Sequence, residues 1–389
     1  MIHHAFQLIE TLATLGTLSG LGYYTLSLWG AAGFLRERKA AEVGGPAQFP
    51  PVSILKPLKG TDPEMLESFR SHCRLDYPEY EIIFGVSEAD DPAAELVKQL
   101  AAEFPQRRIR LVLCLKNLGA NAKVSNLVQM LPEARDQYLV VNDSDIRVEP
   151  DYLKRVIAPL DDPKTGMVTC LYRGVPAPTL GSHLESLGIS SDFSGGVLAA
   201  RVVEGGLHFG LGSTLALRRN DLQAIGGFEA IVDYLADDYE LGKRISGHGL
   251  QVKLSEVVVE TFLPPYSPRE FFDHQLRWAR SVRDSRRWGY AGVALTFGLP
   301  WALLSLALIR GTWWAWELLA VAALLRIILA LVVGRWVVRD RTVVRWFPLI
   351  PLRDIVGLAV WIASFVGHRI TWRGGDFLLK DGKLARIET

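Results

Sequence analysis

Aspartates occur in this sequence at three places where an apolar segment gives way to a polar one, namely Asp90-Asp91, Asp143-Ser144-Asp145 and Asp237-Asp238. A carboxylate at the end of a buried strand can bind a divalent cation, which in turn binds the phosphates of a nucleotide. The alternative is an ordinary loop, because aspartate favours loop starts and an Asp-x-Asp spacing is expected about once by chance in a chain of this length. Since Asp143 and Asp145 come directly after the apolar run YLVV at 138–141, we favour the metal site.

A second set of candidate residues lies in the segment HQLRWARSVRDSRRW at 274–288. Its arginines recur at every third position from Arg277 onward, which places them along one side of a helix. A basic helix just before a membrane segment can simply attract anionic lipid, and we favour that interpretation for the arginines at 283, 286 and 287. At the start of the segment we favour a binding role, in which Arg277 binds a diphosphate, Trp278 shapes a pocket and His274 lies one turn before them.

These side chains need a scaffold, and between roughly Pro50 and Arg283 short apolar runs alternate with amphipathic stretches. Runs such as YEIIFGV at 80–86 predict strands, and stretches such as Pro92 to Phe104, with proline at the start, predict helices. This alternation predicts an α/β fold whose mostly parallel sheet is covered by helices on both faces. Ligands bind beyond the carboxyl ends of the strands in such sheets, so the acidic residues are expected to line one site.

Composition excludes several classes of protein. With 49% hydrophobic and 22% charged residues, the chain has enough apolar surface to bury and is neither disordered nor fibrous. Its net charge of +1 creates no field that would attract nucleic acid. The three cysteines, at 73, 114 and 170, lack the spacing of a zinc site or a disulfide framework and indicate a reducing compartment. The mean hydropathy of +0.17 is high for a soluble enzyme, so part of the chain is expected in lipid.

The apolar residues are concentrated at both ends of the chain. The run from Thr11 to Leu35 has 25 residues without a charge, enough to cross a hydrocarbon core of about 30 Å. Basic residues follow this run, as expected for a retained anchor whose C-terminal side faces the cytosol. Ala291 to Ile309 is uncharged, and Leu318 to Gly334 is apolar apart from Arg326, so two further spans are predicted there.

The stretch from Trp346 to Gly367 is ambiguous, because it is apolar but is interrupted by prolines and charges. A full crossing would place the basic residues that follow it outside, against the usual distribution of cations. A re-entrant or broken helical segment would keep them in the cytosol, and we favour that interpretation. The predicted parts of the chain are an N-terminal anchor at 1–40, a cytosolic α/β domain at 50–266, an amphipathic interfacial helix at 267–288, membrane segments at 289–367 and a cytosolic tail at 368–389.

Seven short motifs follow one another along nearly the whole chain: VSILKPLKG, LDYPEYEIIFGVSEADDP, NAKVSNL, NDSD, GSTLALRR, LADDYELG and HQLRWAR. Their order resembles that of glycosyltransferase family 21, the ceramide glucosyltransferase family. The resemblance is greatest to its bacterial branch, which includes hopanoid-biosynthesis-associated glycosyltransferases. KPLKG at 56–60 and LDYP at 75–78 are specific for this family, whereas the acidic pairs and the Arg-Trp motif are shared with many sugar transferases.

The resemblance implies a GT-A fold with N- and C-terminal transmembrane helices, in the bacterial inner membrane, that binds a UDP-sugar on the cytosolic face. By motif, Asp91 is expected to contact the nucleoside. Asp143 is expected to lie near the diphosphate and a Mg²⁺ or Mn²⁺ ion, with Asp145 as a second metal ligand. Asp238 matches the expected catalytic base, and Lys56, in the first motif, is expected to contact the nucleotide sugar.

The expected chemistry is displacement of UDP with inversion at the anomeric carbon. The charge on the leaving diphosphate must be neutralised, which a metal at Asp143 and Asp145 and the cation Arg277 would do. The acceptor hydroxyl is a poor nucleophile until a carboxylate takes its proton, a role for Asp238, with Asp237 as the rival.

Two further positions have open roles. Lys123 lies just before the strand that leads to Asp143, where it would support the nucleotide or simply begin a polar helix. His274 stands where the family usually has glutamine or arginine, and a histidine donates to a phosphate with a charge that depends on pH.

The sequence therefore predicts a hexosyltransferase that moves glucose or N-acetylglucosamine from a UDP-sugar to the hydroxyl of a membrane lipid, such as ceramide or a hopanoid polyol. Its partners would be the UDP-sugar, the lipid acceptor and the bilayer, with no nucleic acid. One alternative is a processive polysaccharide synthase, which usually carries more membrane spans. Another is a non-catalytic membrane scaffold or transporter subunit, which has no reason to place acids at three successive strand ends.

Overall fold

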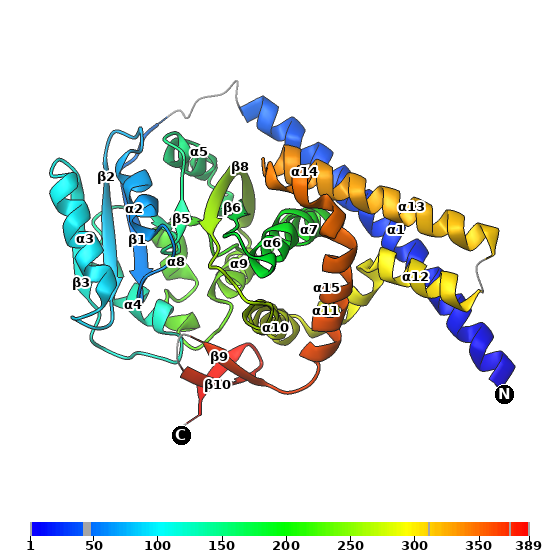
Figure 1. Ribbon diagram of the computed structural model, residues 1–389. Helices are drawn as coiled ribbons and strands as arrows, with labels where there is room; N and C mark the ends of the chain where they lie inside the picture. Colours follow the sequence, from blue (N-terminus) through cyan, green and yellow to red (C-terminus); the bar gives the residue numbers. More distant parts are fainter. Residues whose placement is uncertain (1, 42–47, 310–311, 373–374, 388–389) are drawn as a thin grey trace. The chain divides into compact units, whose positions relative to one another are not determined.

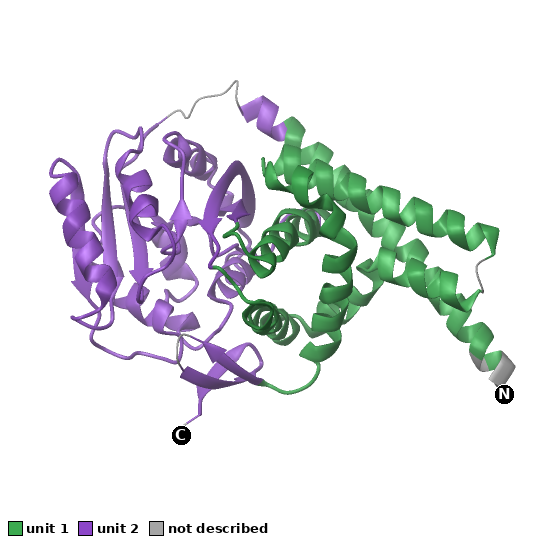
Figure 2. Ribbon diagram, viewed as in Figure 1, with its two compact units in different colours: residues 1–36, 176–203, 265–368 green, residues 37–175, 204–264, 369–389 purple. Residues whose placement is uncertain are grey.

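The structure is a computed structural model that describes residues 2–41, 48–309, 312–372 and 375–387. It contains two compact units, coloured separately in Figure 2. The helical unit comprises residues within 1–36, 176–203 and 265–368, and the α/β unit comprises residues within 37–175, 204–264 and 369–389. Both units are therefore assembled from segments that lie far apart in the sequence.

The α/β unit is built around an eight-stranded sheet with the order β3-β2-β1-β4-β7-β6-β8-β5 (Figure 1). Its strands are β1 (Val52–Leu58), β2 (Tyr80–Val86), β3 (Arg108–Leu113), β4 (Tyr138–Val141), β5 (Ile146–Arg147), β6 (Thr165–Val175), β7 (Leu215–Arg218) and β8 (Gln251–Phe262). The pairs β1·β2, β1·β4, β2·β3 and β6·β8 are parallel, whereas β7 runs antiparallel to β4 and β6, and β5 to β8. The predicted α/β fold with a mostly parallel sheet is confirmed.

Helices cover this sheet and connect its strands. They are α2 (Met65–Cys73), α3 (Pro92–Glu103), α4 (Ala122–Met130), α5 (Tyr152–Ile157), α8 (Arg219–Ala224) and α9 (Asp237–Gly247), with short turns η1 (Leu131–Glu133), η2 (Ala158–Asp161) and η4 (Glu229–Ile231). Every residue of β1 and β2 is buried, as expected for central parallel strands with helices on both faces. Asp91 caps α3 and Asn121 caps α4, each accepting a backbone N–H, so these side chains fix where the two helices begin.

The end of the chain folds into a second, antiparallel sheet, which differs from the tail predicted at 368–389. Its strands are β9 (Arg369–Trp372), β10 (Gly375–Lys380) and β11 (Lys383–Arg386). Phe377 and Leu379 are buried while Leu378 between them is exposed, which is the alternation of a half-buried strand. Asp381 and Gly382 join β10 to β11 with φ angles of 52° and 78°, and two positive φ angles are what a tight two-residue hairpin requires.

The helical unit consists of helices and short helical turns. They are α1 (Ile2–Ala41, of which the part up to residue 36 belongs to this unit), α6 (Leu180–Leu187), η3 (Gly188–Phe193), α7 (Ser194–Val203), α10 (Pro268–Ser285), α11 (Arg287–Gly292), η5 (Val293–Thr296), α12 (Gly298–Leu308), α13 (Trp313–Leu331), η6 (Val332–Val337), α14 (Thr342–Trp346), η7 (Phe347–Leu349) and α15 (Ile350–Ser364). α10 begins with a capping box, in which Ser267 and Glu270 each accept the other's backbone N–H.

Residues 176–203, which lie within the α/β domain predicted at 50–266, belong to the helical unit. A Cβ atom at Gly30 of α1 would lie 2.6 Å from the backbone oxygen of Leu198 in α7, so the two helices are in close contact. Arg326 of α13 forms an ion pair with Asp192 in η3. Close helix packing and a buried charge pair attach this segment to the helices of the helical unit.

Two described segments are long and apolar enough to cross a membrane, Trp313–Val337 and Thr342–Ser364. By length and composition alone, the stretch after Trp346 is therefore able to cross, although we predicted a re-entrant or broken segment. The pair Arg287–Thr296 and Gly298–Leu308 is bent by 55°, which is the geometry of a broken span or a re-entrant loop.

The predicted spans differ from the structure in two details. The bend of 55° interrupts the span predicted at Ala291–Ile309. The anchor predicted at Thr11–Leu35 is one part of the unbroken helix α1, but α1 is not among the candidate spans, because its threonine, serine, glycine and tyrosine residues lower its hydropathy. Its role as an anchor stays a prediction.

Candidate active site

The loop that follows β4 carries Asn142, Asp143 and Asp145 and is supported by buried polar groups. The Asn142 side chain is fully buried, and its Nδ2 donates to the Tyr152 hydroxyl at 2.9 Å and to the Ser213 backbone oxygen at 2.7 Å. A buried amide without partners would cost free energy, so these hydrogen bonds favour one conformation of the loop.

Lys56, predicted to contact the nucleotide sugar, lies in β1 and reaches this loop from inside the protein. Its side chain is fully buried, and its Nζ donates to the backbone oxygen of Asp143 at 2.8 Å. Burial lowers the pKa of Lys56 to about 7. Lys56 thus supports the backbone of the loop at Asp143, and a direct contact with the nucleotide sugar stays a prediction.

Lys123 connects two of the acidic groups. It lies in the first turn of α4, and its Nζ is 2.8 Å from Asp143 Oδ1 and 3.0 Å from Asp237 Oδ2. Burial by itself would lower the pKa of Lys123, but the carboxylates of Asp143 and Asp237 outweigh burial and raise the pKa above its usual range. The ammonium therefore stays charged and links the loop after β4 to the start of α9. The two ion pairs place Lys123 among the acidic side chains of the site. A lysine that only began a polar helix would not require these contacts.

Asp143 and Asp238 face the same small space. A Cβ atom at Gly212 would lie 3.2 Å from Asp143 Oδ2 and 3.2 Å from Asp238 Oδ2, so the glycine leaves room between the two carboxylates. Burial, and then the negative charge of Asp237, raise the pKa of Asp238 to about 6. Asp237 is only 6% exposed and is paired with Lys123, so Asp238 is the member of the pair that faces the space at Gly212.

Asp145 points toward another strand. Its Oδ2 accepts a hydrogen bond from the hydroxyl of Thr261 in β8, and burial, followed by the charge of Asp143, raises the pKa of Asp145 to about 6. Among the residues that the structure describes, no three histidine, cysteine, aspartate or glutamate side chains gather to form a complete metal site. The space at Gly212 fits another kind of site, in which Mg²⁺ or Mn²⁺ is bound by one or two carboxylates together with phosphate oxygens of the substrate. Asp143 as a ligand of such an ion, and Asp145 as a second ligand, stay predictions.

Asp91 connects two loops at the same end of the sheet. Both of its carboxylate oxygens accept the Gly60 backbone N–H, at 3.1 and 3.0 Å, and Oδ1 also accepts the Ala93 N–H at 2.9 Å. Gly60 has a φ of 65°, a conformation that favours glycine, at the end of the KPLKG motif. The carboxylate thus ties the loop after β1 to the start of α3. Its predicted contact with the nucleoside stays a prediction.

His274, Arg277 and Trp278 lie on α10 in the helical unit. His274 Nδ1 is 3.4 Å from Glu185 Oε1, and the imidazole stacks on Tyr266 with 5.2 Å between ring centroids. The Trp278 ring lies 5.4 Å from the His274 ring. The structure therefore brings His274 and Trp278 together beside a buried carboxylate, while the predicted contact of Arg277 with a diphosphate stays a prediction.

Sequence reasoning missed a chain of polar contacts that joins α10 to other helices of this unit. Gln275 donates to Glu185 Oε2 at 2.8 Å and accepts from Arg353 Nη2 at 2.8 Å. Arg353 also lies 3.5 Å from Asp192, which is paired with Arg326. Charged residues inside apolar stretches were the available signal, because ionisable groups at such positions usually pair with one another.

The prediction that Arg283 faces anionic lipid is wrong. Arg283 is only 7% exposed, and its guanidinium donates to the backbone oxygens of Ser364, the last residue of α15, and of Gly367 beyond the helix. The last carbonyl groups of a helix lack partners within the helix, so a cation at this position is stabilising.

Comparison with known proteins identifies the family to which the chain is similar. A model of glycosyl transferase family 21 matches residues 12–385. Ceramide glucosyltransferase 3 of Caenorhabditis elegans is 24% identical over 251 residues, which is 64% of this chain and 54% of that protein. A ceramide glucosyltransferase of Komagataella phaffii is 31% identical over 120 residues, or 30% of this chain and 24% of the relative. The matches thus span 54% or less of the length of these relatives.

Among solved structures, the mannosyltransferase PcManGT from Pyrobaculum calidifontis, in complex with GDP-Man and Mn²⁺, superposes with a TM-score of 0.59. The identity is 20%, and the match covers 92% of this chain and 99% of that one. At this identity the likeness shows the fold alone, an α/β fold of the GT-A type. Because the family model covers nearly all of the sequence, the chain belongs to glycosyl transferase family 21.

Proposed function

We propose that this protein is an inverting glycosyltransferase that moves glucose or N-acetylglucosamine from a UDP-sugar to a hydroxyl group of a membrane lipid, either ceramide or a hopanoid polyol. The observation that carries the proposal is the arrangement of Asp143 and Asp238 around Gly212, with Lys123 between Asp143 and Asp237. Membership of the family and the likeness to ceramide glucosyltransferases support transfer to a lipid. The proposed location is the bacterial inner membrane, with the α/β unit in the cytosol.

Asp238 is the proposed general base. An alcohol attacks the anomeric carbon more readily when a carboxylate takes its proton during the attack, and a base is most useful when its pKa lies near the working pH. A pKa of about 6 leaves Asp238 ionised at neutral pH and still able to accept a proton. Asp237 is less suited, because its carboxylate is buried and paired with Lys123.

The leaving group is UDP, whose diphosphate gains negative charge as the bond to the sugar breaks. Lys123 holds Asp143 in place and offsets part of the negative charge of Asp143 and Asp237, which lessens their repulsion of a diphosphate. A Mg²⁺ or Mn²⁺ ion bound at Asp143 would neutralise further charge on the diphosphate. Asp145 is proposed as a second ligand.

The remaining motif residues are assigned to binding. Arg277 is proposed to bind the diphosphate, Trp278 to form a wall of the acceptor pocket, and His274 to donate to a phosphate. Asp91 is proposed to contact the nucleoside. These assignments rest on the positions of the residues in the motifs.

The decisive experiment supplies the full-length protein, in membranes, with labelled UDP-glucose or UDP-N-acetylglucosamine and with ceramide or a hopanoid polyol. We expect a lipid that carries one hexose, identified by mass, whose formation requires Mg²⁺ or Mn²⁺. A polymer in place of a glycolipid would show a processive synthase. A protein that neither binds UDP nor releases it from either donor would not be an enzyme of this class.

A further inference from the structure

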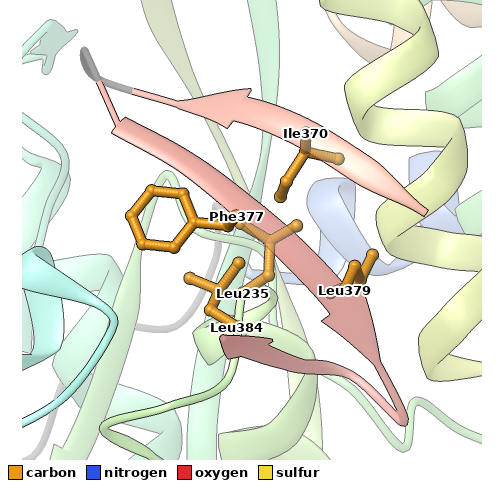
Figure 3. Close-up of a cluster of buried hydrophobic side chains, with 5 residues drawn as sticks. All are labelled: Leu235, Ile370, Phe377, Leu379 and Leu384. Atoms are coloured by element: carbon orange, nitrogen blue, oxygen red, sulfur yellow. The ribbon is translucent and has the colours of Figure 1, made fainter. Parts of the chain in front are cut away.

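The small C-terminal sheet, β9–β11, packs on the loop that leads into Asp237 and Asp238. This loop, residues 232–236, connects η4 to α9. Figure 3 shows the contact, a cluster of buried side chains in which one member, Leu235, comes from the loop. The other members come from the three strands and are Ile370, Phe377, Leu379 and Leu384.

Backbone hydrogen bonds attach the loop to the hairpin of the same sheet. The Leu235 N–H donates to the Gly382 oxygen at 3.0 Å, and the Leu384 N–H donates to the Asp233 oxygen at 2.8 Å. Between these two bonds, the Lys383 ammonium lies 5.3 Å from the centre of the Tyr234 ring. The loop thus pairs with the edge of β11 through backbone hydrogen bonds, as a short neighbouring strand would.

The opposite side of the loop is bound to the segment that starts α4. The Ala120 N–H donates to Asp233 Oδ1 at 2.9 Å, and the Asn121 side chain donates to the Tyr234 oxygen at 2.7 Å. Asn121 is also the cap of α4, the helix that carries Lys123. The loop therefore lies between the C-terminal sheet and the element that presents Lys123 to Asp237.

We infer that the C-terminal sheet is a positioning element for the general base, which holds loop 232–236 so that Asp238 faces the space at Gly212. This inference rests on the function proposed above. The loop has no regular structure of its own, so its conformation depends on the contacts on its two sides. Displacement of a catalytic group by about 1 Å can cost about 100-fold in rate, so a loose loop would slow the reaction even in a folded protein.

A pair of leucines on one strand provides the test. Leu379 is 1% exposed in the cluster, whereas the adjacent Leu378 is 42% exposed on the other face of β10. In full-length protein with UDP-glucose as donor, we expect Leu379→Ala to lower kcat about tenfold or more, while the KM for UDP-glucose changes less, because the base acts only in the transition state. Leu378→Ala should have wild-type kinetics, and Leu379→Met, which nearly restores the volume, should recover most of kcat.

Hydrogen exchange separates positioning from loss of the whole fold. We expect Leu379→Ala to speed exchange of the amides in 232–240 and to leave β1, β2 and β4 protected as in the wild type. Uniformly faster exchange throughout the α/β unit would show that the sheet supports the fold in general and would overturn the inference. Wild-type kcat in Leu379→Ala would overturn it as well.

The inference and the proposed function fail in different ways. If Asp238→Asn retains full activity, the assignment of the base is wrong, and the sheet has no base to position. If Asp238→Asn is inactive while Leu379→Ala turns over at the wild-type rate, the base stands and only the positioning role is refuted.

Discussion

Asp237 and Asp238 are neighbours in the sequence but meet different surroundings. Asp237 is buried and paired with Lys123, which also binds Asp143, so its charge is used to hold the site together. Asp238 shares the space at Gly212 with Asp143. A carboxylate that is already paired with a buried cation is a weak base, because accepting a proton would give up that ion pair. These different surroundings favour Asp238 over Asp237 as the proposed base, a choice that the sequence alone left open.

The two aspartates should give different kinetic defects. Asp238→Asn removes the base and should lower kcat by about 10²–10⁴ while the affinity for UDP changes little. Asp237→Asn removes a partner of Lys123 and should mainly raise the KM for the UDP-sugar. Steady-state kinetics of both variants, with UDP binding measured by calorimetry, separates the roles. A larger loss of kcat in Asp237→Asn than in Asp238→Asn would mean that Asp237 is the base.

The pH dependence should report the raised pKa of Asp238. Burial and the charge of Asp237 raise this pKa to about 6, above the ordinary value for aspartate. The base works only when it is deprotonated, so kcat should be constant near neutral pH and fall as the pH decreases through about 6. Measurement of kcat over the range of about pH 5 to 8 tests this expectation. A profile that stays flat down to about pH 4 would mean that Asp238 has an ordinary pKa or is not the base.

The space at Gly212 can be filled by a single methyl group. In Gly212→Ala the new Cβ would lie 3.2 Å from both Asp143 Oδ2 and Asp238 Oδ2. We expect the affinity for UDP in the presence of Mn²⁺ to fall about tenfold, with little change in thermal stability. Gly206→Ala is the matched control, because no atom lies within 4 Å of a Cβ at that glycine. Unchanged UDP affinity in Gly212→Ala would place the diphosphate elsewhere.

At the scale of elements, the strands of the large sheet were predictable because each is a local run of apolar residues ending at polar ones. The end of β4 led directly to Asp143, whereas the acidic pair at 237–238, expected at a strand end, begins α9 after the loop 232–236. The burial of Lys56 was not predictable, because its full burial depends on packing between segments far apart in the sequence. The C-terminal sheet was missed because its strands have only four to six residues, although Asp381-Gly382 is a hairpin signal.

Replacement of Arg283 should affect the stability of the helical unit, which replacement of a lipid-facing arginine would not. Because its guanidinium donates to the carbonyl oxygens of Ser364, which ends α15, and of Gly367, Arg283→Ala should destabilise the helical unit by about 1–3 kcal/mol. Arg287→Ala, at an exposed position, is the control and should have little effect. Thermal unfolding of both variants in detergent measures the difference. Equal stability of the two variants would mean that the contacts of Arg283 with Ser364 and Gly367 do not stabilise the helical unit.

For the whole molecule, the C-terminal sheet limits how the chain passes through the membrane. Leu235 precedes α10 and Ile370 follows α15, and the two side chains belong to one buried cluster. They therefore lie on the same side of the membrane, and the chain must cross an even number of times between them. Three candidate segments lie in this interval, the bent pair and the two straight ones, so at most two of them cross.

We expect that the segment Thr342–Ser364, which comprises α14 and α15, does not cross the membrane. α15 lies along α10, since Arg353 donates to Gln275 and Arg283 donates to the Ser364 oxygen. α10 carries too many charged residues to enter the hydrocarbon core, and a helix that contacts it near both ends shares its depth. The arginines at 335, 339, 341 and 345 then remain in the cytosol, as the distribution of cations in membrane proteins favours.

Single cysteines introduced on the two sides of these segments decide the topology in intact cells. The natural cysteines are all buried, so they should contribute little background. With the bent pair and α13 as the two crossings, Thr312→Cys, between them, should react with a membrane-impermeant maleimide from outside. Arg341→Cys and Lys380→Cys should react only after the membrane is permeabilised. The opposite result, with Arg341→Cys labelled from outside and Thr312→Cys not labelled, would mean that Thr342–Ser364 crosses and that the bent pair is re-entrant. It would also contradict the argument that α15 shares the shallow depth of α10.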